Sequence, residues 1–270
     1  MFKKTALAAS ISLALSTTAQ ADYRWEAGVD LSGSDNNSIS VDGTFYLKPV
    51  DTSKGPLAEA AFQDHSSYVT ANYTDGEYDG DIINDLEYKN YGVSGRYITD
   101  SAGWILDLGY QRNEPDNPFN TGPDNFEIDQ FSVGGGKYLT DNTTLVGRYI
   151  YAEGDDGADF DRYTLELEHL FQLSWGGIKV DATYGLVDLD DRDDVDIYQI
   201  GGTYYPTNNL GFGASYAKTD ELLDEIEAYS VFAEWFINEQ IAASIEYTDA
   251  ELDDSDVDAD TIVFGVRARF

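Results

Sequence analysis

The sequence predicts a transmembrane antiparallel β-barrel of about fourteen strands, with twelve or sixteen strands as alternatives. Three observations support this fold class. Segments of about ten residues alternate apolar and polar side chains, which is the period of a strand with two different faces. The connections between these segments alternate between longer acidic stretches and tight turns, and the aromatic residues sort by type to opposite ends of the segments. A soluble β-sandwich would show the same alternation but not this sorting.

The first residues predict a cleavable secretory signal. Lys3 and Lys4 precede an apolar stretch over residues 5–15, and the small-residue site Ala19-Gln20-Ala21 follows. The apolar stretch is too short to cross a bilayer as a helix. We therefore expect a signal peptide over residues 1–21 and a single barrel domain over residues 22–270.

The composition excludes several classes of protein. The formal net charge is −35, so the phosphates of a nucleic acid would be repelled. The chain has no cysteine, so no disulfide stabilises it after export. Beyond the leader no apolar run approaches the roughly 20 residues that a membrane-spanning helix needs.

The alternation predicts the strands in order, with boundaries uncertain by about two to four residues. The expected strands cover residues 22–33, 37–48, 57–74, 86–99, 103–113, 126–140, 143–153, 160–173, 177–188, 195–206, 209–219, 226–238, 240–250 and 259–270. The third of these is the least regular. Residues 55–62 could instead form a short periplasmic helical turn that leads into it.

The connections predict how the barrel is oriented. The longer acidic connections cover residues 75–85, 113–125, 155–159, 188–194, 220–225 and 251–258, and the tight ones cover residues 99–102, 140–142, 174–176, 206–209 and 238–239. Outer-membrane barrels have long extracellular loops and short periplasmic turns. Both ends of the mature chain are therefore expected on the periplasmic side.

Aromatic residues provide a second test, because they collect in girdles at the two membrane interfaces. All four tryptophans fall at the end with the tight turns: Trp25, Trp104, Trp175 and Trp235. Tyrosines recur on the outward register at the acidic end: Tyr73, Tyr110, Tyr151, Tyr163, Tyr184, Tyr198, Tyr216, Tyr229 and Tyr247.

Two segments carry a resemblance to known proteins. The last strand ends on Phe270 and resembles the carboxy-terminal signal that the outer-membrane assembly machinery reads. Residues 50–62, with the sequence VDTSKGPLAEAAF, resemble a recurring stretch in a family of general bacterial porins of proteobacteria. The resemblance implies passive diffusion across the outer membrane of a Gram-negative bacterium, without naming a solute.

The inward register predicts a hydrated lumen, because so many charges would be costly to bury in a dry core. The expected pore-lining charges are Arg24, Glu26, Asp30, Asp42, Lys48, Arg96, Asp107, Arg148, Glu166, Glu168, Lys179, Asp181, Glu234, Glu246, Arg267 and Arg269. The excess acid lies in the connections, so we expect a weak to moderate cation preference that arises mainly at the extracellular mouth. None of the loops is long enough to fold inside as a large constriction, which favours an open pore.

Two alternatives to a general porin stay open. The first is a channel specific for a solute such as an oligosaccharide, for which Tyr46, Tyr205, Phe232 and Phe236 face inward but are too scattered to form an aromatic slide. The second is a structural or adhesive barrel whose lumen conducts nothing.

Catalysis and tight metal binding have little support. His65 and His169 both lie towards the periplasmic ends of their strands, away from the acidic connections, so we expect no catalytic residues and no enzyme activity. Asp254, Asp256 and Asp258 give a weak possibility of a Ca²⁺ or Mg²⁺ site. No cofactor is expected. The expected partners are outer-membrane lipid and lipopolysaccharide, the assembly machinery, and small solutes and ions; a monomer and a trimer are both possible.

Overall fold

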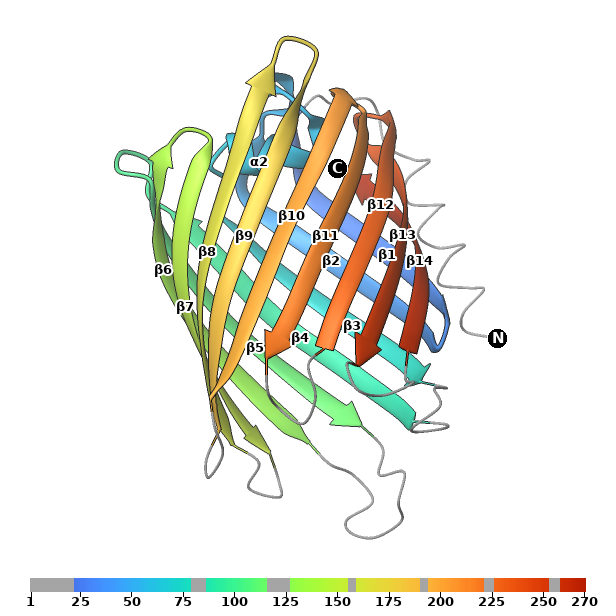
Figure 1. Cartoon of the computed structure of the whole chain (residues 1–270). Coiled ribbons are helices and arrows are strands. Elements are labelled where there is room, and N and C mark those ends of the chain that lie inside the picture. The colour runs from blue at the N-terminus through green and yellow to red at the C-terminus, as the bar shows by residue number, and fades with distance from the viewer. Residues whose placement is uncertain are drawn as a thin grey trace, which may run out of the picture.

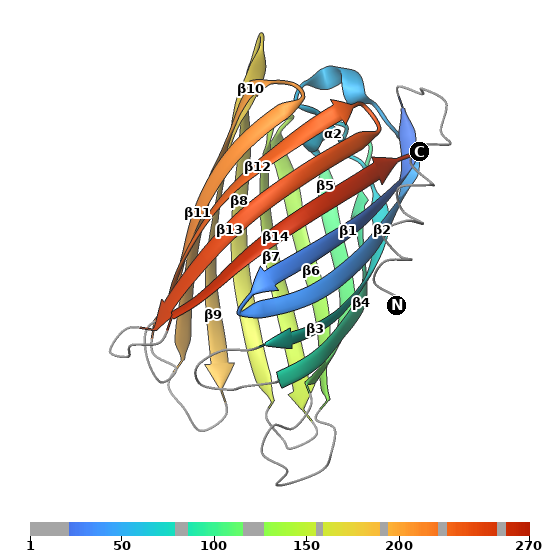
Figure 2. The ribbon, with the colours of Figure 1, turned by 90° about the vertical axis from the view of Figure 1, so that its right-hand side faces the viewer.

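The computed structural model describes residues 22–78, 86–115, 127–154, 159–189, 194–220, 226–252 and 258–270. It is a closed barrel of fourteen antiparallel strands, each paired with its neighbours in sequence (Figures 1 and 2). The strands are β1 (Tyr23–Ser34), β2 (Asn36–Val50), β3 (Tyr68–Tyr78), β4 (Leu86–Ile98), β5 (Trp104–Pro115), β6 (Ile128–Thr140), β7 (Thr143–Gly154), β8 (Phe160–Leu173), β9 (Gly176–Leu189), β10 (Val195–Thr207), β11 (Leu210–Asp220), β12 (Ile226–Asn238), β13 (Ile241–Leu252) and β14 (Asp258–Arg269). Within the described residues, no helix is long and apolar enough to span a membrane.

The barrel closes where the first and last strands meet. β1 pairs with β14 from Glu26 opposite Arg269 to Ser34 opposite Thr261. The last residue continues the seam, since the backbone N–H of Phe270 donates to the Trp25 carbonyl at 2.8 Å and the Phe270 carbonyl accepts from the Trp25 N–H at 3.0 Å. Closure leaves no open strand edge, which is what a sheet needs inside a bilayer.

Each strand presents its apolar side chains outwards. On β8, Tyr163, Leu165 and Leu167 are 45–50% exposed, whereas Thr164 and Glu166 between them are half-buried. This is the reverse of a soluble protein, because the solvent of the outer face is lipid. The predicted fold class and the outward register of these strands are confirmed.

The two aromatic girdles lie where the sequence places them. Trp25, Trp104 and Trp235 are each more than half exposed, at the strand ends that meet the short turns. At the opposite ends, outward tyrosines donate to carboxylates of neighbouring strands: Tyr110 to Asp129 at 2.7 Å, Tyr149 to Asp161 at 2.5 Å and Tyr184 to Asp196 at 2.6 Å. A ring in lipid with its hydroxyl on a charged group suits a membrane–water interface.

The third strand begins later than the sequence predicts, at Tyr68, and the alternative of a helical turn before it is correct. Between β2 and β3 the chain forms η1 (Thr52–Lys54), η2 (Leu57–Glu59) and α2 (Ala60–Gln63). The Asp51 carboxylate accepts from the backbone N–H and the hydroxyl of Ser53, and these hydrogen bonds hold the pKa of Asp51 below its ordinary value. Proline at position 56 has no N–H to donate to a strand ladder, so the helical turns replace an extension of the strand.

Candidate functional site

Residues 51–67, which we call the crossing segment, lie across the mouth at the end with the short turns, which is the end expected on the periplasmic side and is called the periplasmic mouth below. Figures 1 and 2 show α2 inside the rim at the end that carries the carboxyl terminus. The segment hydrogen-bonds to widely separated parts of this rim: Leu57 N to Asn208 O at 2.8 Å, Lys54 O to Gln172 Nε2 at 3.1 Å, Phe62 O to Tyr138 Oη at 2.9 Å and His65 Nε2 to Asp141 O at 3.0 Å. These partners belong to β6, β8 and the turns after β6 and β10, so the segment narrows the mouth from several sides.

A buried carboxylate fastens the crossing segment to the barrel wall. Glu59 is 6% exposed and accepts from the Tyr205 hydroxyl at 2.5 Å. Its other oxygen is 3.3 Å from Lys179 Nζ, which also lies 2.6 Å from Glu168. A buried carboxylate is stable only when such partners compensate for its lost hydration. Glu59 therefore ties the segment to β8, β9 and β10 together.

Arg269 connects the crossing segment to the seam of the barrel. Its Nε donates to Glu26 Oε2 at 2.6 Å, and its Nη1 donates to the Leu57 carbonyl at 2.9 Å. The guanidinium lies over the rings of Tyr23 and Phe236, at 4.6 and 4.5 Å from their centres. One side chain thus joins β1, β12, β14 and the crossing segment.

Charged side chains also line the wall opposite the seam. Arg96 binds Asp107 through two hydrogen bonds, of 2.8 and 2.7 Å. Arg148 lies 3.1 Å from the same carboxylate and 3.7 Å from Glu166. Paired arginines and carboxylates on β4, β5, β7 and β8 give this wall a nearly balanced charge.

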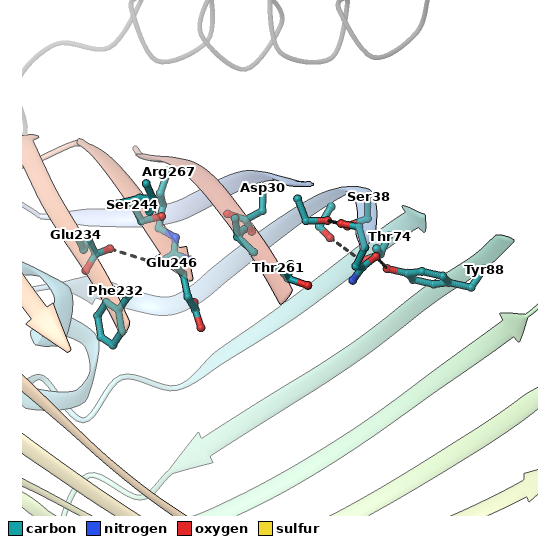
Figure 3. Close-up of a pocket in the computed structure, with 15 residues that line it drawn as sticks. Asp30, Ser38, Thr74, Tyr88, Phe232, Glu234, Ser244, Glu246, Thr261 and Arg267 are labelled. Carbon is teal, nitrogen blue, oxygen red and sulfur yellow. Dashed lines mark hydrogen bonds and ion pairs between the residues drawn. The ribbon is translucent and has the colours of Figure 1, made fainter. Parts of the chain in front are cut away.

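The described residues enclose two cavities of note inside the barrel. The larger of the two, about 540 Å³, lies against β12 to β14 and β1 to β4, and its charged lining residues are Asp30, Glu234, Glu246 and Arg267 (Figure 3); we call it the Arg267 cavity. The smaller, about 360 Å³, lies between the crossing segment and the wall, where it is lined by Glu59, Tyr138 and Lys179 among others. Both cavities are bordered by charged groups, as a hydrated passage would be.

The structure places most of the expected pore-lining charges on the inner side of the wall. Those on the inner side are Glu26, Asp30, Asp42, Arg96, Asp107, Arg148, Glu166, Glu168, Lys179, Asp181, Glu234, Glu246, Arg267 and Arg269. Glu26, Asp107 and Arg269 are buried rather than open to the lumen.

Two of the expected lumen charges lie elsewhere. A register shift between Tyr23 and Trp25 reverses the alternation at the start of β1, so Tyr23 is buried inside while Arg24 is exposed. Arg24 donates to the Leu47 carbonyl at 3.0 Å. Lys48 is exposed at the rim of the barrel, with its Nζ 2.6 Å from a carboxylate oxygen of Asp100. Neither residue lines the lumen.

Sequence reasoning missed the constriction at the periplasmic mouth. Within the described part of the chain, the barrel is narrowed by the irregular segment after β2 and not by a long connection. Pro56 and the alanines that follow it interrupt the strand pattern, and this irregularity is the sequence signal by which the segment could have been found. The inward-facing Arg162 on β8 was missed as well.

The inward aromatic residues do not form a slide. Tyr46, Tyr205 and Phe236 are buried at the mouth, packed around the crossing segment, and Phe232 lines the Arg267 cavity.

Neither histidine lines a cavity. His65 stacks on Tyr138 with ring centres 3.8 Å apart, and Nδ1 of His169 is 2.7 Å from the Thr143 hydroxyl. Asp254 and Asp256 lie outside the described residues, as do the predicted signal peptide and most of the acidic connections. The described residues contain no group of three or more potential metal ligands.

Solved structures share this fold at low sequence identity. The outer membrane protein Omp33 of Acinetobacter baumannii is 21% identical with a TM-score of 0.64, over 93% of this chain and 99% of that one. A bacterial polysaccharide outer membrane secretin is 11% identical with a TM-score of 0.55, over 93% and 100% of the two chains. The toluene transporter TodX of Pseudomonas putida is 12% identical with a TM-score of 0.51, over 93% and 91%.

Family membership rests on the sequence. Among curated proteins none matches this chain. Residues 2–183, more than half of the chain, match the model of the family described as "Putative general bacterial porin". Together with the closed transmembrane barrel, this match shows that the chain belongs to that porin family and resides in the bacterial outer membrane.

Proposed function

We propose that this porin is a passive diffusion channel for small hydrophilic solutes and ions. The observation that carries the proposal is the Arg267 cavity, where charged groups of both signs face a space of about 540 Å³. A filled barrel would have to pair each charge in a dry core, at a cost of several kcal/mol per ion. A water-filled lumen keeps these groups solvated without that cost.

The charge of the lumen supports a weak preference for cations. The wall formed by β12 to β2 carries Asp30, Asp42, Glu234 and Glu246, whereas Arg267 is the cation of its cavity. Charges along a pathway set its selectivity. The acidic connections, which are expected at the extracellular mouth, would add to this preference and would be screened over about 8–10 Å near physiological salt.

The crossing segment limits the size of the solute. It lies between the Arg267 cavity and the periplasm and is held by Glu59 and Arg269. Solutes must therefore pass around it or displace it, which favours ions and small molecules.

Single-channel recording of the refolded protein in a planar bilayer tests the proposal. We expect stable ohmic steps and a reversal potential in a KCl gradient that indicates cation preference, with the preference falling at high salt. A preference for anions that salt does not change would contradict the assigned selectivity. Folded protein that gives no steps would contradict passive diffusion itself.

A non-conducting structural or adhesive barrel is the second candidate, and the crossing segment is the observation that favours it. If the segment closes the mouth permanently, the folded protein stays silent under every voltage and salt condition. A channel specific for an oligosaccharide would instead conduct ions and be blocked by that sugar. Phe232 and Tyr88 are the aromatic side chains in the lining of the Arg267 cavity that such a sugar would contact.

We also propose that the protein works without catalysis and that its last strand is read during assembly. The backbone of Phe270 is hydrogen-bonded to β1 at the seam, so assembly and closure involve the same residue. Deleting Phe270 should lower the amount of protein in the outer membrane of cells, and an unchanged amount would refute this role. Lipopolysaccharide is expected to contact the tyrosine girdle. Hydrolysis of lipid by the purified protein would contradict the proposal that the protein is not a catalyst.

A further inference from the structure

The guanidinium of Arg267 is not closely hydrogen-bonded to the carboxylates around it. The Nε atom of Arg267 lies 3.5 Å from Glu26 and its Nη1 lies 3.8 Å from Glu234. Both distances exceed the usual length of a charge-assisted hydrogen bond, and within the described chain this Nε has no hydrogen-bond partner. This Nε atom is itself buried, but the side chain as a whole is 40% exposed and lines the cavity, so the rest of the guanidinium is open to a solute.

Two other arginines show the contrast. Arg96 makes two short hydrogen bonds to Asp107 and its side chain is 16% exposed. Arg269 donates to Glu26 and to the Leu57 carbonyl, and its side chain is 4% exposed. These two guanidiniums already have close partners, whereas Arg267 still presents the planar fork that recognises a carboxylate.

Carboxylates surround this arginine in the same cavity. Asp30 and Glu246 lie on the strands that flank β14, opposite Gly265 and Val263 respectively, and Figure 3 shows them beside Arg267 and Glu234. Among the described residues neither Asp30 nor Glu246 has a basic side chain within 4 Å, although Thr248 donates to Glu246 at 3.5 Å. The cavity therefore offers open acceptors for ammonium groups next to an open donor for a carboxylate.

Hydroxyl groups complete the lining. Ser244 and Thr261 lie between the charged residues, and Ser38 and Thr74 continue the polar wall. A volume of about 540 Å³ falls within the range of small-molecule sites. Most of the residues that line the cavity are polar, so an apolar solute would displace water from these groups without replacing the hydrogen bonds that they lose.

We propose that the Arg267 cavity binds amino acids that carry a second ammonium group. The carboxylate of such a solute would pair with Arg267, and its two ammonium groups would pair with Asp30 and with Glu246 or Glu234. Three carboxylates against one arginine leave the cavity negatively charged, which favours a ligand with two positive groups and one negative group. The proposal deepens the proposed channel function by naming a solute class, and it rests on that function for transport but not for binding.

Calorimetric titration of the folded protein in detergent tests binding without requiring conduction. The probes are L-lysine, 1,5-diaminopentane, which lacks the carboxylate, and 6-aminohexanoate, which lacks the α-amino group. We expect lysine to bind most tightly, by about tenfold over either analogue, because each missing group forfeits one charge-assisted hydrogen-bonded pair. Equal affinities for the three probes, or no binding of lysine, would overturn the proposal.

Substitutions in the cavity test which residues bind the carboxylate and which bind the ammonium groups of the ligand. Arg267→Gln should reduce lysine affinity about tenfold and leave that of 1,5-diaminopentane unchanged or higher, whereas Asp30→Asn and Glu246→Gln should weaken both amines. Arg112→Gln is the matched control, because Arg112 lies at the rim and pairs with Asp129 at 2.7 Å, outside the cavity. If Arg267→Gln fails to fold, Arg267→Lys keeps the charge without the fork and should give an intermediate loss for lysine alone.

The same variants separate this proposal from the channel function. Lysine binding by a protein that conducts no ions would refute passive diffusion and leave the binding site standing. Ion conduction without any difference among the three probes would leave the channel standing and refute the binding site.

Discussion

Arg269 and Glu26 are joined across the seam of the barrel by a hydrogen bond of 2.6 Å, and both side chains are buried. The pair links the last strand to the first at the point where the crossing segment touches the wall. Breaking a buried ion pair by removing one partner typically costs about 3–5 kcal/mol, because the other charge is left without compensation.

Arg269→Met should therefore lower the free energy of unfolding by about 3–5 kcal/mol in denaturant titrations of the refolded barrel. Lys48→Met is the control, since its ion pair with Asp100 is exposed and such pairs are worth about 0–1 kcal/mol. Equal losses for the two variants would show that burial of the Arg269–Glu26 pair is not what stabilises the seam.

Replacing residues 52–66 by a tight turn should raise the single-channel conductance several-fold. The crossing segment spans the mouth, and removing it leaves a passage bounded only by the strands. The deletion also removes Glu59, so Lys179 keeps Glu168 as its partner at 2.6 Å and the wall stays neutralised. Unchanged conductance in planar bilayers would show that the narrowest point lies elsewhere.

Phe264→Arg should destabilise the barrel by about 2–4 kcal/mol if this residue lies near the middle of the bilayer. Phe264 is 57% exposed on the lipid face, whereas Val263 beside it lines the Arg267 cavity. Val263→Arg places the same charge in water and should cost less. Folding titrations into lipid vesicles compare the two, and similar costs would contradict the assigned register of β14.

Gly28→Ala should change the current through the lumen more than the stability of the barrel. Asp42 on β2 lies opposite Gly28, and its carboxylate occupies the space that a β-carbon at Gly28 would fill. The carboxylate is the free end of its side chain, so it can rotate away from the wall and into the passage. We expect a lower single-channel conductance with nearly unchanged unfolding.

Gly33→Ala is the matched control on the same strand, because nothing lies within 4 Å of a β-carbon at Gly33. Its conductance should equal that of the parent protein. A Gly28→Ala current that also equals the parent would show that Asp42 does not border the conducting path.

The sequence by itself determined the barrel, predicted about fourteen strands and gave their register over most of the chain. Alternation fixed which face of β8 meets lipid, because a strand has only two faces and one of them must be apolar in a bilayer. Trp104 and Tyr184 marked the two ends of the apolar band, because aromatic side chains prefer its interfaces. These signals are local, so they can be read along one strand at a time.

Only the tertiary structure decided where the barrel is constricted and which charged side chains are buried, paired or exposed. Arg24 left the lumen because one register shift in β1 reversed the alternation, which no pattern in β1 itself reveals. Glu59 is buried because Tyr205 on β10 and Lys179 on β9 contact it, and both are more than a hundred residues away in sequence. Arg267 and Arg269 are alike in sequence, but only Arg269 meets the crossing segment. Closure of the barrel brings such distant residues together, so their partners depend on the whole fold rather than on their neighbours in the chain.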